Sequence, residues 1–157
     1  MSYIEKNLVA GEKLLYRTNL HWLVFLWPAI FFLGFLGVII GLASEPAVRD
    51  IVGGVFLLLT VITGIPAWIK SSSSEFGVTN KRVLIKVGFI RRHSMEILLS
   101  KVEGIGVDQS LWGRIFGYGS IHVTGTGGTN EHFHRIASPL EFRRRVQEQI
   151  AATQETK

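Results

Sequence analysis

Basic side chains gather in a short stretch near the middle of the chain. They are Lys81, Arg82, Lys86, Arg91 and Arg92. Lysine and arginine close to a membrane are attracted to anionic headgroups, and each base contributes about 1 kcal/mol. The set is therefore the strongest candidate in this sequence for binding lipid headgroups. Two other interpretations stay open, because the same charges would serve as a solvated surface or as a signal that keeps the segment on the cytoplasmic side of a membrane.

Three histidines form a second candidate site. His132 and His134 alternate on one strand face, and His122 would lie opposite His134 if residues 120–124 and 131–137 pair around a glycine-rich tip. Three imidazoles on one face could bind zinc or copper. Solvated polar positions on an exposed sheet face explain the pattern more simply. We therefore expect no metal and no other cofactor.

Motifs for catalysis or nucleotide binding are weak in this sequence. The run Gly125–Thr129 has no lysine and joins two predicted strands, whereas a phosphate-binding loop follows a strand and opens a helix. The sequence shows no paired carboxylates in an evident pocket motif and no serine, histidine and acid in a known catalytic signature. It also contains no cysteine. Aromatic residues do not interleave with the bases on one surface, which argues against nucleic-acid binding. We therefore expect a protein that is not an enzyme.

Two long apolar segments must position these candidates. Trp22–Ala43 and Ile51–Ile69 contain no charged residue, and the connection 44–50 is too short to hold a domain. At about 1.5 Å per residue, either segment could cross a hydrocarbon core of about 30 Å as a helix. A soluble domain of ordinary size could not bury two helices that are apolar on all sides. The sequence predicts a transmembrane helical hairpin over residues 22–69 and a separate domain over residues 70–157.

The distribution of charges predicts how this hairpin is oriented. The connection holds one base, Arg49, against Glu45 and Asp50, whereas bases are frequent on the outer sides of both apolar segments. Lysine and arginine collect on the side of a membrane that is not translocated. We therefore expect both termini in the cytoplasm. Residues 1–21 would be a cytoplasmic segment, either amphipathic at the interface or a strand docked on the C-terminal domain.

The region after the hairpin is predicted to be mainly β-structure. A polar, flexible bridge is expected at Ser71–Ser74. Apolar and polar residues alternate in Arg82–Val87, as in a half-buried antiparallel strand. A short helical turn is expected within residues 109–118. The predicted strands cover residues 75–79, 82–87, 95–99, 102–108, 120–124 and 131–137.

The chain ends in a predicted amphipathic helix. Ser138, Pro139 and Glu141 form the pattern of a helix start with a capping box. Apolar residues then recur at every fourth position, at Phe142, Val146 and Ile150. Short antiparallel strands followed by one such helix predict an α+β domain, with a bent β-barrel or sandwich capped by the C-terminal helix.

Five segments of this region together resemble the bacterial pleckstrin-homology-like family, which occurs in small membrane proteins. In chain order they are Phe76–Ile85, Gly88–Arg92, Leu98–Glu103, Gln109–Ile121 and Ser138–Phe142. The resemblance runs from about Glu75 to Ile150, and the family often carries a preceding hairpin of this kind. It implies a seven-stranded, strongly bent β structure closed at one end by the C-terminal helix. It also implies a protein of the bacterial inner membrane without catalytic activity.

Two functions of different classes fit this organisation. The first is a non-catalytic scaffold at the cytoplasmic membrane face that binds a partner protein or other copies of the chain, with Phe76, Trp112 and Phe116 as contact candidates. The second is binding of anionic membrane lipids by the basic set, near the hairpin where eukaryotic pleckstrin-homology domains bind inositol phosphates. A domain anchored by two helices needs no lipid affinity for recruitment, so we expect the scaffold function. Lipid contact would orient the domain.

Overall fold

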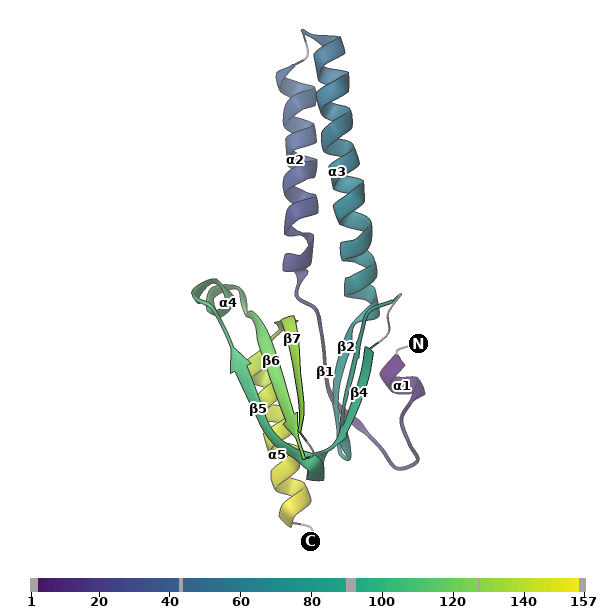
Figure 1. Cartoon of the computed structure of the whole chain (residues 1–157), viewed down its shortest axis with the longest axis vertical. Helices are drawn as coiled ribbons and strands as arrows, with labels where there is room; N and C mark the ends of the chain where they lie inside the picture. Colours follow the sequence, from purple (N-terminus) through teal and green to yellow (C-terminus); the bar gives the residue numbers. More distant parts are fainter. Residues whose placement is uncertain (1–2, 43, 90–92, 127, 156–157) are drawn as a thin grey trace. The chain divides into compact units, whose positions relative to one another are not determined.

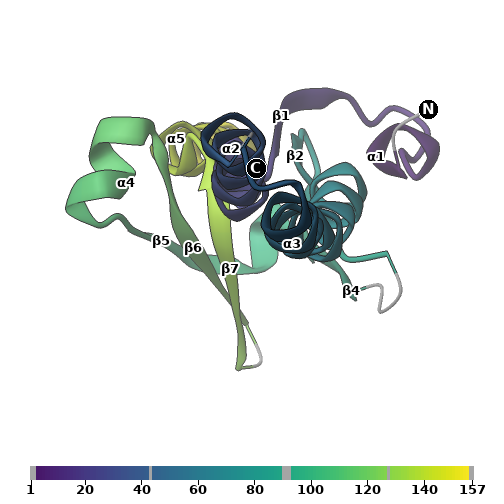
Figure 2. The same cartoon turned by 90° about the horizontal axis from the view of Figure 1, so that it is seen from above.

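The structure, a computed structural model, describes residues 3–42, 44–89, 93–126 and 128–155. The chain forms two compact units, whose elements are labelled in Figures 1 and 2. One unit is the helical segment Trp22–Ser72. The other combines the chain up to His21 with the chain from Ser73 onward, so it is assembled from two separate stretches of sequence.

The helical unit contains two helices in the regions that the sequence predicts to cross a membrane. A 3₁₀ turn at Trp22–Phe25 (η1) leads into α2 at Leu26–Gly41, and α3 spans Pro46–Ser73. By length and composition, both helices are able to span a bilayer. The connection between them is shorter than predicted, because α3 begins with proline, a residue suited to the first turn of a helix.

Small residues let the two helices of this unit pack closely. A methyl group added to Gly34 of α2 would lie only 2.4 Å from the ring of Phe56 on α3. A methyl group added to Gly53 of α3 would meet the ring of Phe35 on α2 at ordinary van der Waals distance. Glycines at such positions allow apolar helices to approach each other without a side chain between them.

Helix α3 continues further than the sequence suggests. The flexible bridge predicted at Ser71–Ser74 is wrong, because Ser71–Ser73 form the last turn of α3. Only Ser74 separates this helix from β2, which begins at Glu75.

The second unit consists of two antiparallel sheets and a C-terminal helix. The strand orders are β1-β2-β3-β4 and β5-β6-β7. The strands are β1 (Leu14–Asn19), β2 (Glu75–Thr79), β3 (Arg82–Val87), β4 (His93–Leu98), β5 (Val102–Asp108), β6 (Tyr118–Gly125) and β7 (Thr129–Ala137). The helices are α1 (Tyr3–Lys6), the 3₁₀ turn η2 (Leu99–Lys101), α4 (Leu111–Phe116) and α5 (Pro139–Glu155). This agrees with the expected strands and closing helix, but the described strands form two sheets and no closed barrel.

The first strand of this unit precedes the helical hairpin in sequence. β1 pairs antiparallel with β2, with Asn19 opposite Glu75 and Arg17 opposite Gly77. The hairpin is therefore inserted between two neighbouring strands of one sheet. The sequence left open whether residues 1–21 form an interfacial segment or a docked strand, and the structure decides for the strand.

The N-terminal residues also cover the outer face of this sheet. The carboxylate of Glu75 accepts hydrogen bonds from the backbone N–H groups of Tyr3 (3.3 Å) and Ile4 (3.2 Å) in α1. Ile4 is fully buried against Gly77, where a methyl group would come within 2.7 Å of it. Leu84 lies opposite Gly77 in the sheet and is buried as well. The half-buried pattern predicted for β3 is therefore wrong, because the N-terminal segment shields a face that the sequence assigns to water.

One apolar core joins the two sheets and α5. Its fully buried side chains include Phe76, Val78, Val83, Ile121, Val123, Ile136, Phe142 and Val146. Helix α5 begins at Pro139 as predicted and buries Phe142 and Val146 of its apolar stripe, whereas Ile150 is half-buried. The predicted capping box is replaced by other contacts: the N–H of Ser138 donates to the carbonyl of Gly117 (2.9 Å), and Glu141 pairs with Arg144 of its own helix.

We predict that the β-rich unit folds without the helical hairpin only when both of its stretches are present. A variant with a short glycine–serine linker in place of residues 22–72 keeps α1, β1 and the pairing of Asn19 with Glu75. It should unfold cooperatively in a thermal melt followed by circular dichroism. A fragment that starts at Ser73 lacks β1 and exposes surface that Ile4 covers, so it should show no cooperative transition. Cooperative melting of that fragment at the temperature of the linker variant would contradict a discontinuous domain.

Candidate functional site

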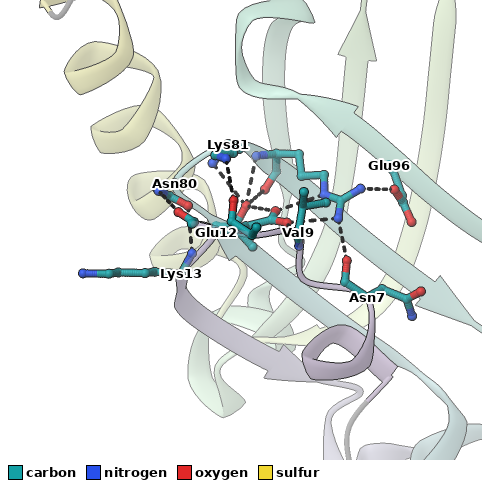
Figure 3. A network of polar contacts seen from close by, with 11 residues as sticks. Asn7, Val9, Glu12, Lys13, Asn80, Lys81 and Glu96 are labelled. Atoms are coloured by element: carbon teal, nitrogen blue, oxygen red, sulfur yellow. Dashed lines mark hydrogen bonds and ion pairs between the residues drawn. The ribbon is translucent and has the colours of Figure 1, made fainter.

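Part of the predicted headgroup site lies in a network of polar contacts, in which Figure 3 labels Glu12, Lys81 and Glu96. Arg82, the first residue of β3, donates to the carboxylate of Glu12 (3.0 Å) and to the backbone carbonyl of Asn7 (2.6 Å). It also forms an ion pair with Glu96 of β4. Only 15% of its side chain is exposed. The guanidinium therefore already has three partners and is not free to bind a phosphate.

The other described members of the basic set contact the N-terminal segment too. The ammonium group of Lys81 donates to the carbonyl of Ala10 (3.2 Å), and that of Lys86 lies 4.6 Å from the centroid of the Tyr3 ring. Arg91 and Arg92 lie outside the described residues. The three described bases thus fasten the N-terminal segment to the first hairpin of the domain. The sequence did not indicate this role, because it left the position of residues 1–21 open.

Glu12 is the buried anion of this network. It accepts hydrogen bonds from Arg82, from the N–H of Val9 (2.9 Å) and from the hydroxyl of Thr79 (2.7 Å). Burial by itself raises the pKa of this carboxyl, but the hydrogen bonds and the charge of Arg82 outweigh burial and lower its pKa from 4.5 to about 2. Glu12 is therefore ionised and fully compensated at neutral pH.

Two of the three residues predicted to contact a partner are exposed, and the third is not. Phe76 of β2 is fully buried and packs edge-to-face on Phe133, with ring centroids 5.9 Å apart. Its assignment as a contact residue is wrong, because both faces of β2 are covered. Trp112 and Phe116 of α4 are accessible over 65% and 45% of their surface.

Helix α4 carries a cluster of exposed apolar side chains. Leu111 and Ile115 are accessible over 77% and 70% of their surface, beside Trp112 and Phe116. The last two rings stack with their centroids 6.1 Å apart. We call these four residues the α4 surface. Apolar side chains that gather on the outside of a domain mark sites of interaction with a protein or a membrane.

The backbone of α4, rather than its side chains, packs on the rest of the domain. Gly113 is buried so close to the carbonyl of Tyr118 that a methyl group would come within 2.6 Å of it. The hydroxyl of Ser110 accepts the N–H of Gly113 (3.1 Å) and caps the helix, which Gly117 ends in the left-handed conformation (φ 75°). Figure 1 shows α4 at the ends of β5 and β6.

The histidines do not form the predicted group of three. His122 of β6 lies opposite His132 of β7, with ring centroids 5.6 Å apart, and not opposite His134. The register set at the hairpin tip, with Gly125 opposite Thr129, gives this pairing, and a β-bulge shifts the register only beyond it, between Gly119 and Ile121. His134 instead contacts the hydroxyl of Ser120 through Nδ1 (2.9 Å). In the part of the chain that the structure describes, no three histidine or acidic side chains come together as metal ligands.

An open cavity of about 400 Å³, lined mainly by polar residues, lies beside α4, where the sequence indicated no site. Its walls are formed by Asp108, Gln109, Ser110, Tyr118, Gly119, Ser120 and Arg135. Arg135 has a φ of 60°, a left-handed conformation that is uncommon for arginine. The sequence carried no signal for this site, because the bulge that places Arg135 there leaves no mark in the alternation of residue types.

The chain leaves the domain for the helical hairpin at the edge where α4 and this cavity lie. Leu20, just after β1, pairs with Ile136 of β7, and the N–H of His21 donates to the carbonyl of Arg135 (2.8 Å). The ring of His21 lies 5.4 Å from the ring of Tyr118, which begins β6 directly after α4. The cavity, α4 and the exit of the chain are therefore neighbours within this domain.

Comparison with known families supports this architecture. Residues 28–153 match the bacterial PH domain family, and this stretch covers most of the chain. The chain belongs to the bacterial PH domain family. Neither the curated proteins nor the solved structures contain a match. The family match starts after β1, although β1 is a strand of this PH domain. PH domains are typically non-catalytic interaction modules.

The contact between Glu12 and Arg82 predicts a pH dependence of the stability of this PH domain. The pKa of Glu12 is lowered in the folded state, so its stabilising effect is present above about pH 4.5 and is lost as the pH falls toward 2. The melting temperature of the detergent-solubilised protein should therefore fall steeply over that range.

Substitution of Glu12 separates its contribution to the pH dependence from the contributions of other acidic residues that titrate in the same range. Glu12→Gln should lower the melting temperature at pH 7, because it leaves Arg82 without its buried counter-charge, and it should flatten the decline below pH 4.5. Glu103→Gln, at an exposed position of β5, is the matched control and should change neither quantity. A wild-type melting profile for Glu12→Gln would show that the contact does not stabilise the domain.

Proposed function

We propose that this protein is a non-catalytic module of the bacterial cytoplasmic membrane whose PH domain docks on the bilayer through the α4 surface. Docking would orient the domain, so that its other surfaces are presented to a partner protein or to a second copy of the chain. The observation that carries this proposal is the group of four exposed apolar side chains at the edge where the chain leaves for the hairpin.

The helical hairpin supplies the anchor in this proposal. Its two helices have the length and composition of membrane spans. Its connection carries Arg49 against Glu45 and Asp50, whereas bases are frequent in the PH domain. This asymmetry supports a cytoplasmic domain with both termini on the same side.

Chain continuity supports the bilayer as the occupant of the α4 surface. His21 directly precedes the 3₁₀ turn that opens the first candidate span, and Ser74 alone separates α3 from β2. Because one residue extends a chain by at most about 3.6 Å, an edge tied to two spans in this way stays close to the headgroups. The composition of α4 fits that location. Tryptophan favours the interface, the aliphatic side chains and Phe116 favour the acyl region, and Arg114 can extend its charge toward phosphates.

A second candidate assigns the α4 surface to a protein, either a partner or a second copy, as in the scaffold that the sequence favours. The stacked pair of Trp112 and Phe116 supports this candidate, because aromatic residues are enriched at protein interfaces. Headgroup binding by the basic set has less support. Arg82 is occupied by Glu12 and Glu96, and Lys86 lies over the Tyr3 ring.

Spin labelling in proteoliposomes distinguishes these occupants. The chain contains no cysteine, so Ile115→Cys places a single label on the α4 surface, and Gln147→Cys places a matched label at an exposed position of α5. Oxygen concentrates in hydrocarbon, whereas a charged nickel complex stays in water. We expect the label at position 115 to collide more with oxygen and less with nickel than the label at position 147.

Two other spin-label results would assign the α4 surface differently. A label at position 115 that is shielded from both reagents would assign the α4 surface to a protein contact and support the second candidate. Equal and high nickel collision at positions 115 and 147 would show that α4 faces water, which would overturn both candidates.

A further inference from the structure

We propose that the cavity beside α4 binds a phosphate ester that also carries an amine, with Arg135 on the phosphate and Asp108 on the ammonium group. The smallest ligand of this class is phosphoethanolamine, and the headgroup of phosphatidylethanolamine has the same chemistry. The cavity, at about 400 Å³, has room for such a group.

Local backbone geometry places Arg135 at this cavity. Ser120 alone faces two residues of β7, His134 and Arg135, because the register of the strand pair shifts between Gly119 and Ile121. Arg135 adopts its left-handed φ of 60° at this bulge. Bulges redirect side chains beside functional sites, and unfavourable backbone conformations gather at such sites. No ion pair of Arg135 occurs among the described residues, so its charge is available to a ligand.

Neighbouring polar groups complete a phosphate site. Because the oxygen of Ser110 accepts the N–H of Gly113, its own hydroxyl proton remains free to be donated. The side-chain amide of Gln109 donates to the carbonyl of Tyr118 (2.9 Å), which fixes one wall of the cavity. An arginine and a hydroxyl residue in the wall of one cavity suit the oxygens of a phosphate, because the arginine fork can donate two parallel hydrogen bonds.

Asp108 makes the site selective for a zwitterion over a simple anion. Asp108 lines the cavity, and its carboxylate, on a side chain that is 76% exposed, lies 3.5 Å from Nδ1 of His122. A bare phosphate at Arg135 would be repelled by this negative charge. A ligand with an ammonium group beside its phosphate would place a positive charge at Asp108 and satisfy both residues.

The position of the cavity favours a lipid as the source of the ligand. The carbonyl of Arg135 and the ring of Tyr118 hold His21, where the chain continues toward the hairpin. Ser110, which caps α4, is part of the cavity wall. The assignment to a lipid rests on the proposed function, since it needs this edge to face the bilayer. The assignment of the ligand chemistry to Arg135 and Asp108 does not.

Thermal shifts of the detergent-solubilised full-length protein test the ligand chemistry. We expect a saturable rise in melting temperature with phosphoethanolamine and a smaller rise with inorganic phosphate, because a ligand that binds only the folded state stabilises it. Arg135→Gly removes the guanidinium but accepts the left-handed φ, so this variant should fold and bind phosphoethanolamine roughly ten-fold more weakly or worse. Asp108→Asn should abolish the preference over inorganic phosphate. Arg143→Gln, on α5, is the matched control and should bind like the wild type.

Two further comparisons identify the source of the ligand and the results that would overturn the proposal. A larger shift with phosphatidylethanolamine than with phosphatidylglycerol in mixed micelles would identify the lipid headgroup as the ligand. A response to phosphoethanolamine without any lipid preference would assign the cavity to a soluble ligand. Bilayer docking would then be tested by the spin-label experiment alone. Wild-type binding of phosphoethanolamine by Arg135→Gly, or an unchanged preference in Asp108→Asn, would overturn the site whatever the spin labels show.

Discussion

The pairing of β1 with β2 joins the stretch of chain before the helical hairpin to the stretch after it. The whole helical hairpin separates these strands in sequence, and placing Asn19 opposite Glu75 makes both of its ends leave the PH domain at one edge. The other end of β1 is held by Glu12, whose buried charge is balanced by Arg82 and by the hydroxyl of Thr79. Because breaking a buried ion pair leaves the other charge uncompensated, displacing this end of β1 would destabilise the domain.

The same constraint brings the candidate functional features together. Leu20 and His21 follow β1 onto β7 and β6, beside α4 and the cavity at Arg135. The apolar α4 surface is complementary to the acyl region of a bilayer. The cavity, which has one acid and one base, is complementary to the headgroups. The edge proposed to dock on the bilayer is therefore the edge at which the β1–β2 strand pair ends. Within the domain, the basic residues near Arg82 hold the N-terminal segment in place.

The local elements of the fold could be predicted from sequence, whereas their long-range partners could not. Residue alternation and turn signals gave β2, β3 and β5, the apolar segments gave the two long helices, and the spacing of Trp112 and Phe116 gave an exposed α4. Membership of β1 in the domain depends on pairing across the hairpin, which leaves no local pattern. The burial of Phe76 and Leu84 follows from that pairing and from the docking of Ile4. The contact of His122 with His132 depends on the register that the hairpin tip sets, and the placement of Arg135 depends on a bulge, which shifts a register without changing the alternation of residues.

Hydrogen exchange in the full-length protein tests the central claim, that β1 is a strand of the PH domain although it precedes the hairpin. If Leu14–Asn19 pairs with β2, its bonded amides exchange only when the sheet opens. They should then be protected to the same degree as the amides of β2 and β3, and lose that protection together with them when the pH is lowered toward the pKa of Glu12. Exchange of Leu14–Asn19 at the rate of an unstructured segment, with β2 and β3 still protected, would contradict the account.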